Sequence, residues 1–287
     1  MKSNKSWGSK FESASFTSVQ LKVISLQFRN IAMTTEGSVT SHIESGVAII
    51  TFFHPQSNSM PGNLLRALAA EISKSGDDQN VNVIILKSEG EKAFCAGASF
   101  DELMSISSFD EGRNFFSGFA LVINAIRKAP KFVIARVQGK AVGGGVGVAA
   151  AADYTLAHQS ADVKLSELAI GIGPFVVGPA VERKIGSSAF TSLSINATEW
   201  QNAGWAKEKG LYAEVFATIS ELDAAVNKLA SKLADSSPLA MQQLKSVFWK
   251  GTEDWDTFLI ERAEMSGTLV LSDFTRNAIS KFKAGAR

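Results

Sequence analysis

The chain has little of what marks several large classes of protein. Among its 287 residues there is a single cysteine, Cys95, and the formal net charge is only +1. One cysteine excludes an intrachain disulfide framework and suits a reducing compartment. A charge near zero gives no electrostatic reason to expect a nucleic acid or membrane partner. No apolar run approaches the roughly 18 residues of a membrane span. We therefore expect a soluble, cytoplasmic, globular protein.

Metal ligands and nucleophiles are also scarce. The three histidines, His42, His54 and His158, show no ligand spacing, so we expect no metal site. Cys95 has no histidine near it in the sequence, and we expect a small buried residue there, not a nucleophile. Apolar residues make up 45% of the chain and charged residues 20%, which is the composition of a folded domain with a sizeable core.

Residues 1–33 have a composition of their own. They hold five basic residues against Glu12 alone, together with seven serines, and leave 24 basic and 27 acidic residues in the remainder. A basic, serine-rich leader resembles a transit peptide, which would place the protein in an organellar matrix. We favour an upstream start codon, because Met33 would be an ordinary first residue for the remainder of the chain. Either kind of leader stands outside the folded domain.

Strand-like runs alternate with helical periodicity in the first half of the remaining chain. The expected strands are 47–53, 81–86, 132–137 and 154–157, and the expected helices are 61–75 and 110–128. Asp110 is the expected cap of the second helix. Strands that alternate with helices predict α/β units around a mostly parallel sheet.

From about residue 187 onward, helical periodicity dominates. The expected helices are 187–193, 198–206, 220–235, 238–249, 256–271 and 273–283, and one strand-like run lies at 211–216. We therefore divide the folded part into an α/β core, residues 34–195, and a helical C-terminal region, residues 196–287.

Two glycine-containing loops, Lys92–Asp101 and Gln138–Gly147, each follow a strand-like run. Small residues let a backbone approach a ligand, and unpaired N–H groups at the start of a helix favour negative charge. Neither loop matches the dinucleotide fingerprint, and no Walker-type phosphate-binding loop is present. A glycine turn by itself is weak evidence, because glycine often marks tight turns.

Taken together, the two loops resemble those of the crotonase (enoyl-CoA hydratase/isomerase) superfamily. Further matching features occur in family order over residues 37–285: His54-Pro55, the segment Glu167–Gly186, the turn Lys209–Leu211 and the helix from Pro238 to Lys245. The resemblance implies a crotonase-like spiral of β-β-α units with a helical C-terminal region that assembles into a homotrimer or hexamer. It also implies an acyl-CoA substrate and no cofactor beyond the CoA moiety of that substrate.

The resemblance assigns an oxyanion hole to two backbone N–H groups, those of Ala98 and Gly144. Two such donors stabilise the charge that develops on a thioester oxygen when a neighbouring carbon loses a proton. Removal of one donor of this kind costs roughly 3 kcal/mol of transition-state stabilisation.

Family hydratases carry two glutamates, and this chain keeps only one of the two positions. The first is Gly147 here, and the second is Glu167. A single buried glutamate with a raised pKa can take a proton from one carbon and return it to another. That is the chemistry of the 3,2-enoyl-CoA isomerases, which the pair Pro174-Phe175 also resembles. We favour such isomerisation, with hydration, including that of branched or methylglutaconyl-type substrates, as the alternative.

The sequence gives weaker indications of the residues that bind CoA. The resemblance implies contacts with Lys92 and with the loop residues Ala96 and Gly97. Lys281 near the C-terminus is a further candidate for the CoA of a neighbouring subunit, although a solvated basic cluster at a helix end is an equal interpretation. A different hypothesis is a weakly catalytic scaffold or RNA-binding relative, and the balance of −3 over residues 34–287 argues against it.

Overall fold

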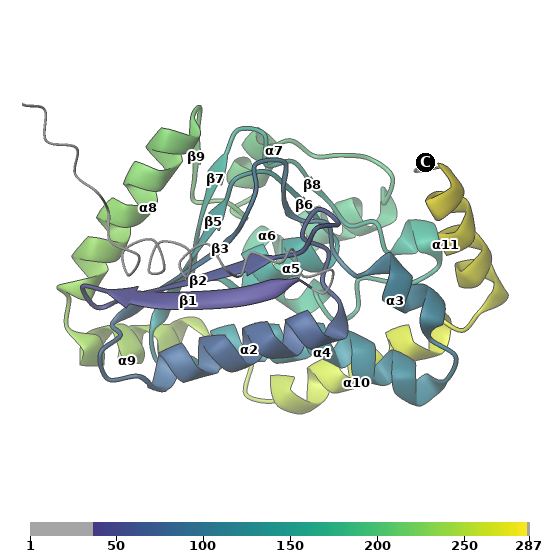
Figure 1. The fold of residues 1–287 in the computed structure, drawn as a ribbon, viewed down its shortest axis with the longest axis horizontal. Helices are drawn as coiled ribbons and strands as arrows, with labels where there is room; N and C mark the ends of the chain where they lie inside the picture. Colours follow the sequence, from purple (N-terminus) through teal and green to yellow (C-terminus); the bar gives the residue numbers. More distant parts are fainter. Residues whose placement is uncertain (1–36, 286–287) are drawn as a thin grey trace, which may run out of the picture. The chain divides into compact units, whose positions relative to one another are not determined.

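The computed structural model describes residues 37–285, and the leader therefore lies outside the described residues. The main sheet has six strands in the order β1-β2-β3-β5-β7-β9, with β1 antiparallel to β2 and all other pairs parallel (Figure 1). The strands are β1 Ser38–Glu44, β2 Val47–Phe53, β3 Val83–Ser88, β5 Phe132–Val137, β7 Tyr154–His158 and β9 Glu214–Phe216. The predicted, mostly parallel sheet is confirmed, and the edge strand β1 is an addition to it.

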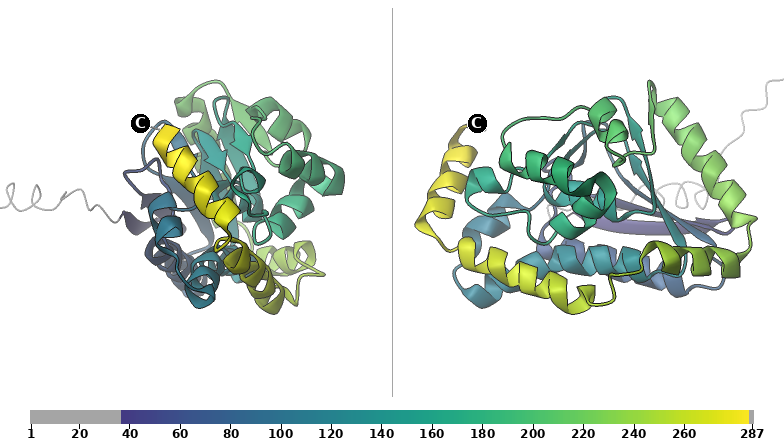
Figure 2. Two further views of the ribbon diagram at one scale, coloured as in Figure 1. Left: turned by 90° about the vertical axis from the view of Figure 1, so that its right-hand side faces the viewer. Right: turned by 180° about the vertical axis from the view of Figure 1, so that it is seen from behind.

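Side chains of the central strands alternate between two apolar layers. In β3, Val83 and Ile85 face a cluster that includes Leu222 and Val226 of α8 (Ile219–Ala234). The next residues, Ile84 and Leu86, belong to the larger cluster with α2 (Gly62–Asp77) and α4 (Phe109–Lys128). Figures 1 and 2 show the helices of the two layers, α8 on one side of the sheet and α2 with α4 on the other. Burial on two faces explains why these strands are continuous apolar runs in the sequence.

Helix α4 begins where the sequence predicted a helix, but its cap differs. Ser108 is the N-cap, and its hydroxyl accepts the Glu111 N–H at 3.3 Å. Asp110, the expected cap, lies in the first turn, where a negative charge interacts favourably with the helix dipole.

A second, smaller sheet was not predicted. Its three parallel strands are β4 (Ala93–Cys95), β6 (Lys140–Val142) and β8 (Val163–Lys164), in that order. Strands of two or three residues carry too little periodicity to be recognised in a sequence. Because they are parallel, their carboxyl ends meet at one edge, and the segments after them are brought together there.

The C-terminal region is helical, as predicted. Its helices are α7 Ala203–Glu208, α8, α9 Pro238–Phe248, α10 Trp255–Leu269 and α11 Asp273–Gly285, and α6 Gly178–Ile195 directly precedes them. Helix α6 starts well before the expected residue 187, with a proline in its first turn, and is kinked at Gly186. The division at residue 195/196 stays a prediction, and the pairing of β9 with β7 crosses it.

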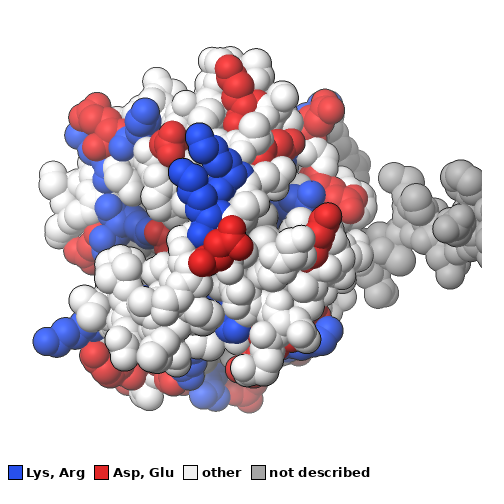
Figure 3. Space-filling view, turned by 90° about the vertical axis from the view of Figure 1, so that its left-hand side faces the viewer, with Lys and Arg blue, Asp and Glu red and all other residues white. Residues whose placement is uncertain are grey.

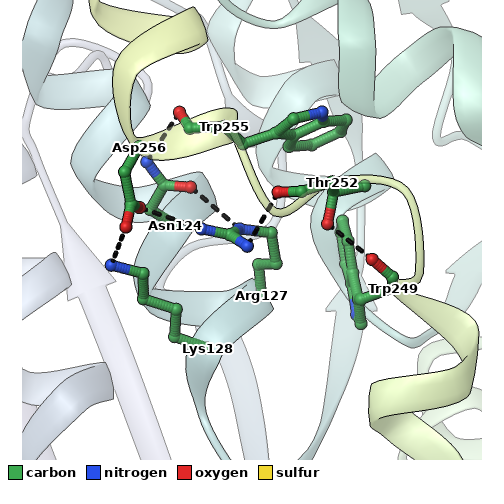
Figure 4. A network of polar contacts seen from close by, with 7 residues as sticks. All are labelled: Asn124, Arg127, Lys128, Trp249, Thr252, Trp255 and Asp256. Carbon is green, nitrogen blue, oxygen red and sulfur yellow. Dashed lines mark hydrogen bonds and ion pairs between the residues drawn. The ribbon is translucent and has the colours of Figure 1, made fainter.

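Two polar networks attach α9 and α10 to the rest of the fold. In the first, Arg127 of α4 donates to the Thr252 carbonyl at 2.9 Å and pairs with Asp256 at 2.9 Å (Figure 4). In the second, Asp153 pairs with the buried Lys245 of α9 at 2.8 Å. The side chain of Asp153, which directly precedes β7, is itself buried, at 5% exposed.

No helix in the described part of the chain is long and apolar enough to span a membrane.

Candidate active site

The segment after β4 supplies the first loop of the site. Gly97 has a φ of +88°, and a Cβ there would lie 2.9 Å from the Val142 carbonyl oxygen of the second loop. Only glycine suits both conditions. The Gly97 N–H donates to the Cys95 Sγ at 3.4 Å. The two loops therefore touch through backbone atoms, and Ala98 comes directly after their junction.

The segment after β6 supplies the second loop. Gly143 has a φ of +51° and turns the chain into α5 (Gly144–Ala151). Gly144 is packed closely against α4, because a Cβ there would lie 2.0 Å from the Phe119 ring. Within the described residues, the N–H groups of Ala98 and Gly144 donate to no protein acceptor. At Gly144 this results from its place as the first residue of a helix.

The segment after β8 supplies Glu167, which precedes the short helix η1 (Leu168–Ile170). Its Oε1 lies 2.9 Å from where a Cβ on Gly143 would be, so the carboxylate rests on the glycine turn that opens α5. The residue as a whole is half-buried, but its Oε2 is buried and has no hydrogen-bond partner. Burial disfavours the charged form and raises the pKa of Glu167 to about 7.

These three segments enclose what we call the catalytic cavity, a space of about 60 Å³. Ala96, Gly97, Ala98, Gly144 and Glu167 all line it, so the structure brings together five of the seven predicted site residues. Among the described residues that line the cavity, Glu167 alone has an ionisable side chain. The rest of the wall is largely apolar and includes Phe100, Leu103, Phe116, Phe119, Ile170, Phe175, Val176 and Val177.

The two predicted lysines do not line the catalytic cavity. Lys92 lies before β4 and Lys281 lies on α11, and both are exposed. Helix α11 nevertheless packs close to the site, because a Cβ on Gly171 of the segment after η1 would lie 2.5 Å from the Phe274 ring. Contacts of both lysines with CoA stay predictions.

Gly147 requires a correction. Position 147, where the family hydratases carry their first glutamate, would be expected to face the cleft, but Gly147 does not line the catalytic cavity. A Cβ there would lie 2.5 Å from both Cβ and Cγ1 of Val177, a buried residue that does line the cavity. The space toward which a side chain at 147 would point is thus filled by valine.

Sequence reasoning missed the aromatic wall and Ser166, which lines the cavity next to Glu167. Phe116 and Phe119 are spaced as neighbours on one face of a helix, which indicated burial but not contact with a ligand. Cys95 is buried as expected, and burial raises the pKa of its thiol to about 12, so the thiolate nucleophile is not formed near neutral pH.

Comparisons with known proteins show the family and the fold of this chain. The model of the enoyl-CoA hydratase/isomerase family matches residues 42–281, and the chain belongs to this family. A crystal structure of an enoyl-CoA hydratase from Bacillus halodurans matches with a TM-score of 0.78 at 22% identity, over 85% of this chain and 99% of that one. The α/β class with a crotonase-like spiral of β-β-α units is therefore confirmed.

Two curated relatives are hydratases by name. The chain is 34% identical over 200 residues to the mitochondrial methylglutaconyl-CoA hydratase of Homo sapiens. This match covers 68% of this chain and 58% of the human protein. It is 28% identical over 265 residues to the short-chain-enoyl-CoA hydratase of Clostridium acetobutylicum, over 90% of this chain and 95% of that protein. The matched region thus spans less than two thirds of the human relative.

Proposed function

We propose that this protein shifts a double bond in an enoyl-CoA thioester from carbon 3 to carbon 2, with Glu167 as the group that moves the proton. The observation that carries the proposal is the chemistry of the catalytic cavity. Its described lining residues include one carboxylate and two residues whose backbone N–H groups have no protein acceptor. One base and one oxyanion hole suffice to move a proton between two carbons, whereas no second carboxylate is present there to hold an attacking water.

The reaction is a pair of proton transfers. The Glu167 carboxylate removes a proton from carbon 2, and the electron pair moves into the thioester, whose oxygen becomes an enolate. The N–H groups of Ala98 and Gly144 donate to that oxygen, and such preorganised donors act most strongly where water is excluded. The protonated Glu167 then returns the proton to carbon 4, and the double bond lies between carbons 2 and 3. A pKa of about 7 suits both roles, because either protonation state is accessible near neutral pH.

Hydration of a 2-enoyl-CoA is the second candidate. It is favoured by the names of the two relatives above and by the position of Ser166 beside Glu167 at the cavity wall. A water held by Glu167 and the serine hydroxyl would then add to carbon 3, and Glu167 alone would handle both protons.

Recognition of CoA by Lys92, Ala96, Gly97 and Lys281 is part of the same proposal, as is assembly into a trimer or hexamer. Assembly is supported by an apolar face of α9, where Leu239, Leu244 and Val247 are exposed. An RNA-binding relative would need a basic stripe. On the face drawn in Figure 3, acidic and basic side chains are interspersed. We retain a cytoplasmic location as a prediction.

The test is to incubate the purified protein separately with a 3-enoyl-CoA and a 2-enoyl-CoA of the same length, and to identify the products. We expect 2-enoyl-CoA from the first to form faster than 3-hydroxyacyl-CoA from the second. Efficient hydration without measurable isomerisation would establish the second candidate and overturn the first.

A further inference from the structure

Phe175 stands between two cavities. On one side it lines the catalytic cavity of about 60 Å³. On the other side it lines a larger space of about 420 Å³, which we call the outer cavity. Pro174 and Phe175 are the residues common to both linings. The Phe175 ring lies against the backbone of Gly173, since a Cβ on that glycine would lie 2.4 Å from it. The absence of a side chain at 173 is what allows the ring to take this position.

The size of the catalytic cavity limits the acyl group that fits. A cavity of about 150 Å³ in another protein holds benzene, which has six carbon atoms. At about 60 Å³, the catalytic cavity is less than half as large. By the same measure it holds about two to three carbon atoms, so an acyl group of about four or five carbons already reaches the wall, and a longer chain meets the ring of Phe175.

The lining also limits the charge of the acyl group. Among the described lining residues, the only ionisable side chain is Glu167, which is acidic. A second carboxylate at the far end of an acyl group would be desolvated there with no cation to pair with, which is costly. Arg262, by contrast, lines the outer cavity together with Phe190 and Phe258 and lies on the other side of Phe175.

We propose that Phe175 is a specificity-determining residue that closes the acyl site to all but short, uncharged acyl groups, and that the outer cavity is the space a longer chain would occupy. This inference rests on the proposed function only in that the cavity takes an acyl-CoA. It differs from what the name of the human relative would suggest, because a methylglutaconyl group carries a free carboxylate at its far end.

The test measures binding of saturated acyl-CoAs, which do not react, by calorimetry at pH 8. For the wild type we expect butyryl-CoA to bind at least about tenfold more tightly than octanoyl-CoA.

In Phe175→Ala the preference should reverse, because each methylene buried in an apolar space contributes about fourfold in affinity. Phe109→Ala is the matched control: it truncates the same kind of side chain at an exposed position that lines neither cavity, and we expect it to change the ratio by less than about threefold. Phe175→Leu, with melting temperatures for all variants, guards against misfolding.

Charge is tested with two acyl groups of equal length. Pentanoyl-CoA should bind at least about tenfold more tightly than glutaryl-CoA, which differs by its terminal carboxylate. Equal binding of butyryl-CoA and octanoyl-CoA by the wild type, or of pentanoyl-CoA and glutaryl-CoA, would overturn the inference and leave the proposed function standing. Failure of every acyl-CoA to bind would overturn both.

Discussion

A buried carboxylate lies at each end of helix α5, and the two carboxylates differ in their hydrogen-bond partners. At its C-terminal end, Asp153 accepts from Lys245 at 2.8 Å, from the Trp249 indole N–H at 3.0 Å and from the Val133 N–H at 2.8 Å. At its N-terminal end, the Oε2 of Glu167 is buried and has no partner. The first carboxylate has its hydrogen bonds satisfied, and the second does not.

The difference in hydrogen bonding indicates a structural role for Asp153 and a chemical role for Glu167. A buried charge with a complete set of partners can be held at little net cost, whereas an unpaired one is costly and usually adjusts its pKa. The Asp153 network joins α9 to the core, since Lys245 also donates to the carbonyls of Ile126 and Lys131 at 2.7 Å each. The unpaired Glu167 Oε2 contributes no bond to the fold. A strongly perturbed group in a cavity is a candidate for catalysis, and the contrast with Asp153 supports that interpretation.

The largest expected effect is on turnover at the N-terminal end. Glu167→Gln keeps the shape of the side chain but cannot accept a proton, so kcat should fall by about a hundredfold or more. Binding of butyryl-CoA should stay nearly unchanged, because the amide fills the same space. Steady-state assays and calorimetry measure the two quantities. Retention of more than about a tenth of kcat would place the base elsewhere.

At the C-terminal end of α5, we expect a substitution to lower stability and to leave turnover unchanged. Lys245→Met removes the cation that pairs with the buried Asp153 carboxylate, which should lower the free energy of unfolding by about 3–5 kcal/mol. The kcat of the folded fraction should be retained. Urea unfolding measures the stability, and Lys250→Met, at an exposed lysine just after α9, serves as the control with a change within about 0.5 kcal/mol. Equal stabilities of the two variants would contradict the claim that the Asp153–Lys245 pair stabilises the fold.

The pH dependence of stability should differ between Glu167→Gln and the wild type. Because folding raises the pKa of Glu167 from 4.5 to about 7, the contribution of this group is fully present below about pH 4.5 and is lost as the pH rises through about 7. The glutamine variant does not lose it. Its melting temperature relative to the wild type should rise between pH 5 and pH 8, by at least about 2 °C. A constant difference would mean that the carboxylate is not desolvated in the folded state.

The smallest expected effect is a gain of hydration from a restored second glutamate. Gly147→Glu alone should destabilise the fold without gaining activity, because Val177 occupies the space, and overpacking costs about 1–3 kcal/mol. The double variant Gly147→Glu with Val177→Ala provides room. We expect it to hydrate 2-enoyl-CoA faster than Val177→Ala alone, in parallel assays. A gain from the single change would show that Val177 moves aside readily.

Much of the fold was predictable, and the reason lies in length and periodicity. The strand Phe132–Val137 and the helix α4 were found almost to the residue, because long apolar patterns determine them. The small sheet β4-β6-β8 was missed, although the segments that follow its three strands line the catalytic cavity. The convergence of Ala98, Gly144 and Glu167 was predicted from the family resemblance, not from periodicity. Packing of distant side chains, such as Val177 against Gly147, has no local signal in the sequence.

The central claim is that one carboxyl group carries a proton from carbon 2 to carbon 4. A 3-enoyl-CoA of four or five carbons, deuterated at carbon 2, tests it most directly, with the position of the label read by NMR after a single turnover. We predict that a measurable part of the deuterium appears at carbon 4 of the 2-enoyl-CoA, because Glu167 acts in a small, largely apolar cavity. The Glu167→Gln variant should transfer none. Formation of 3-hydroxyacyl-CoA from 2-enoyl-CoA by the same protein, with no label at carbon 4 and no movement of the double bond, would contradict the account.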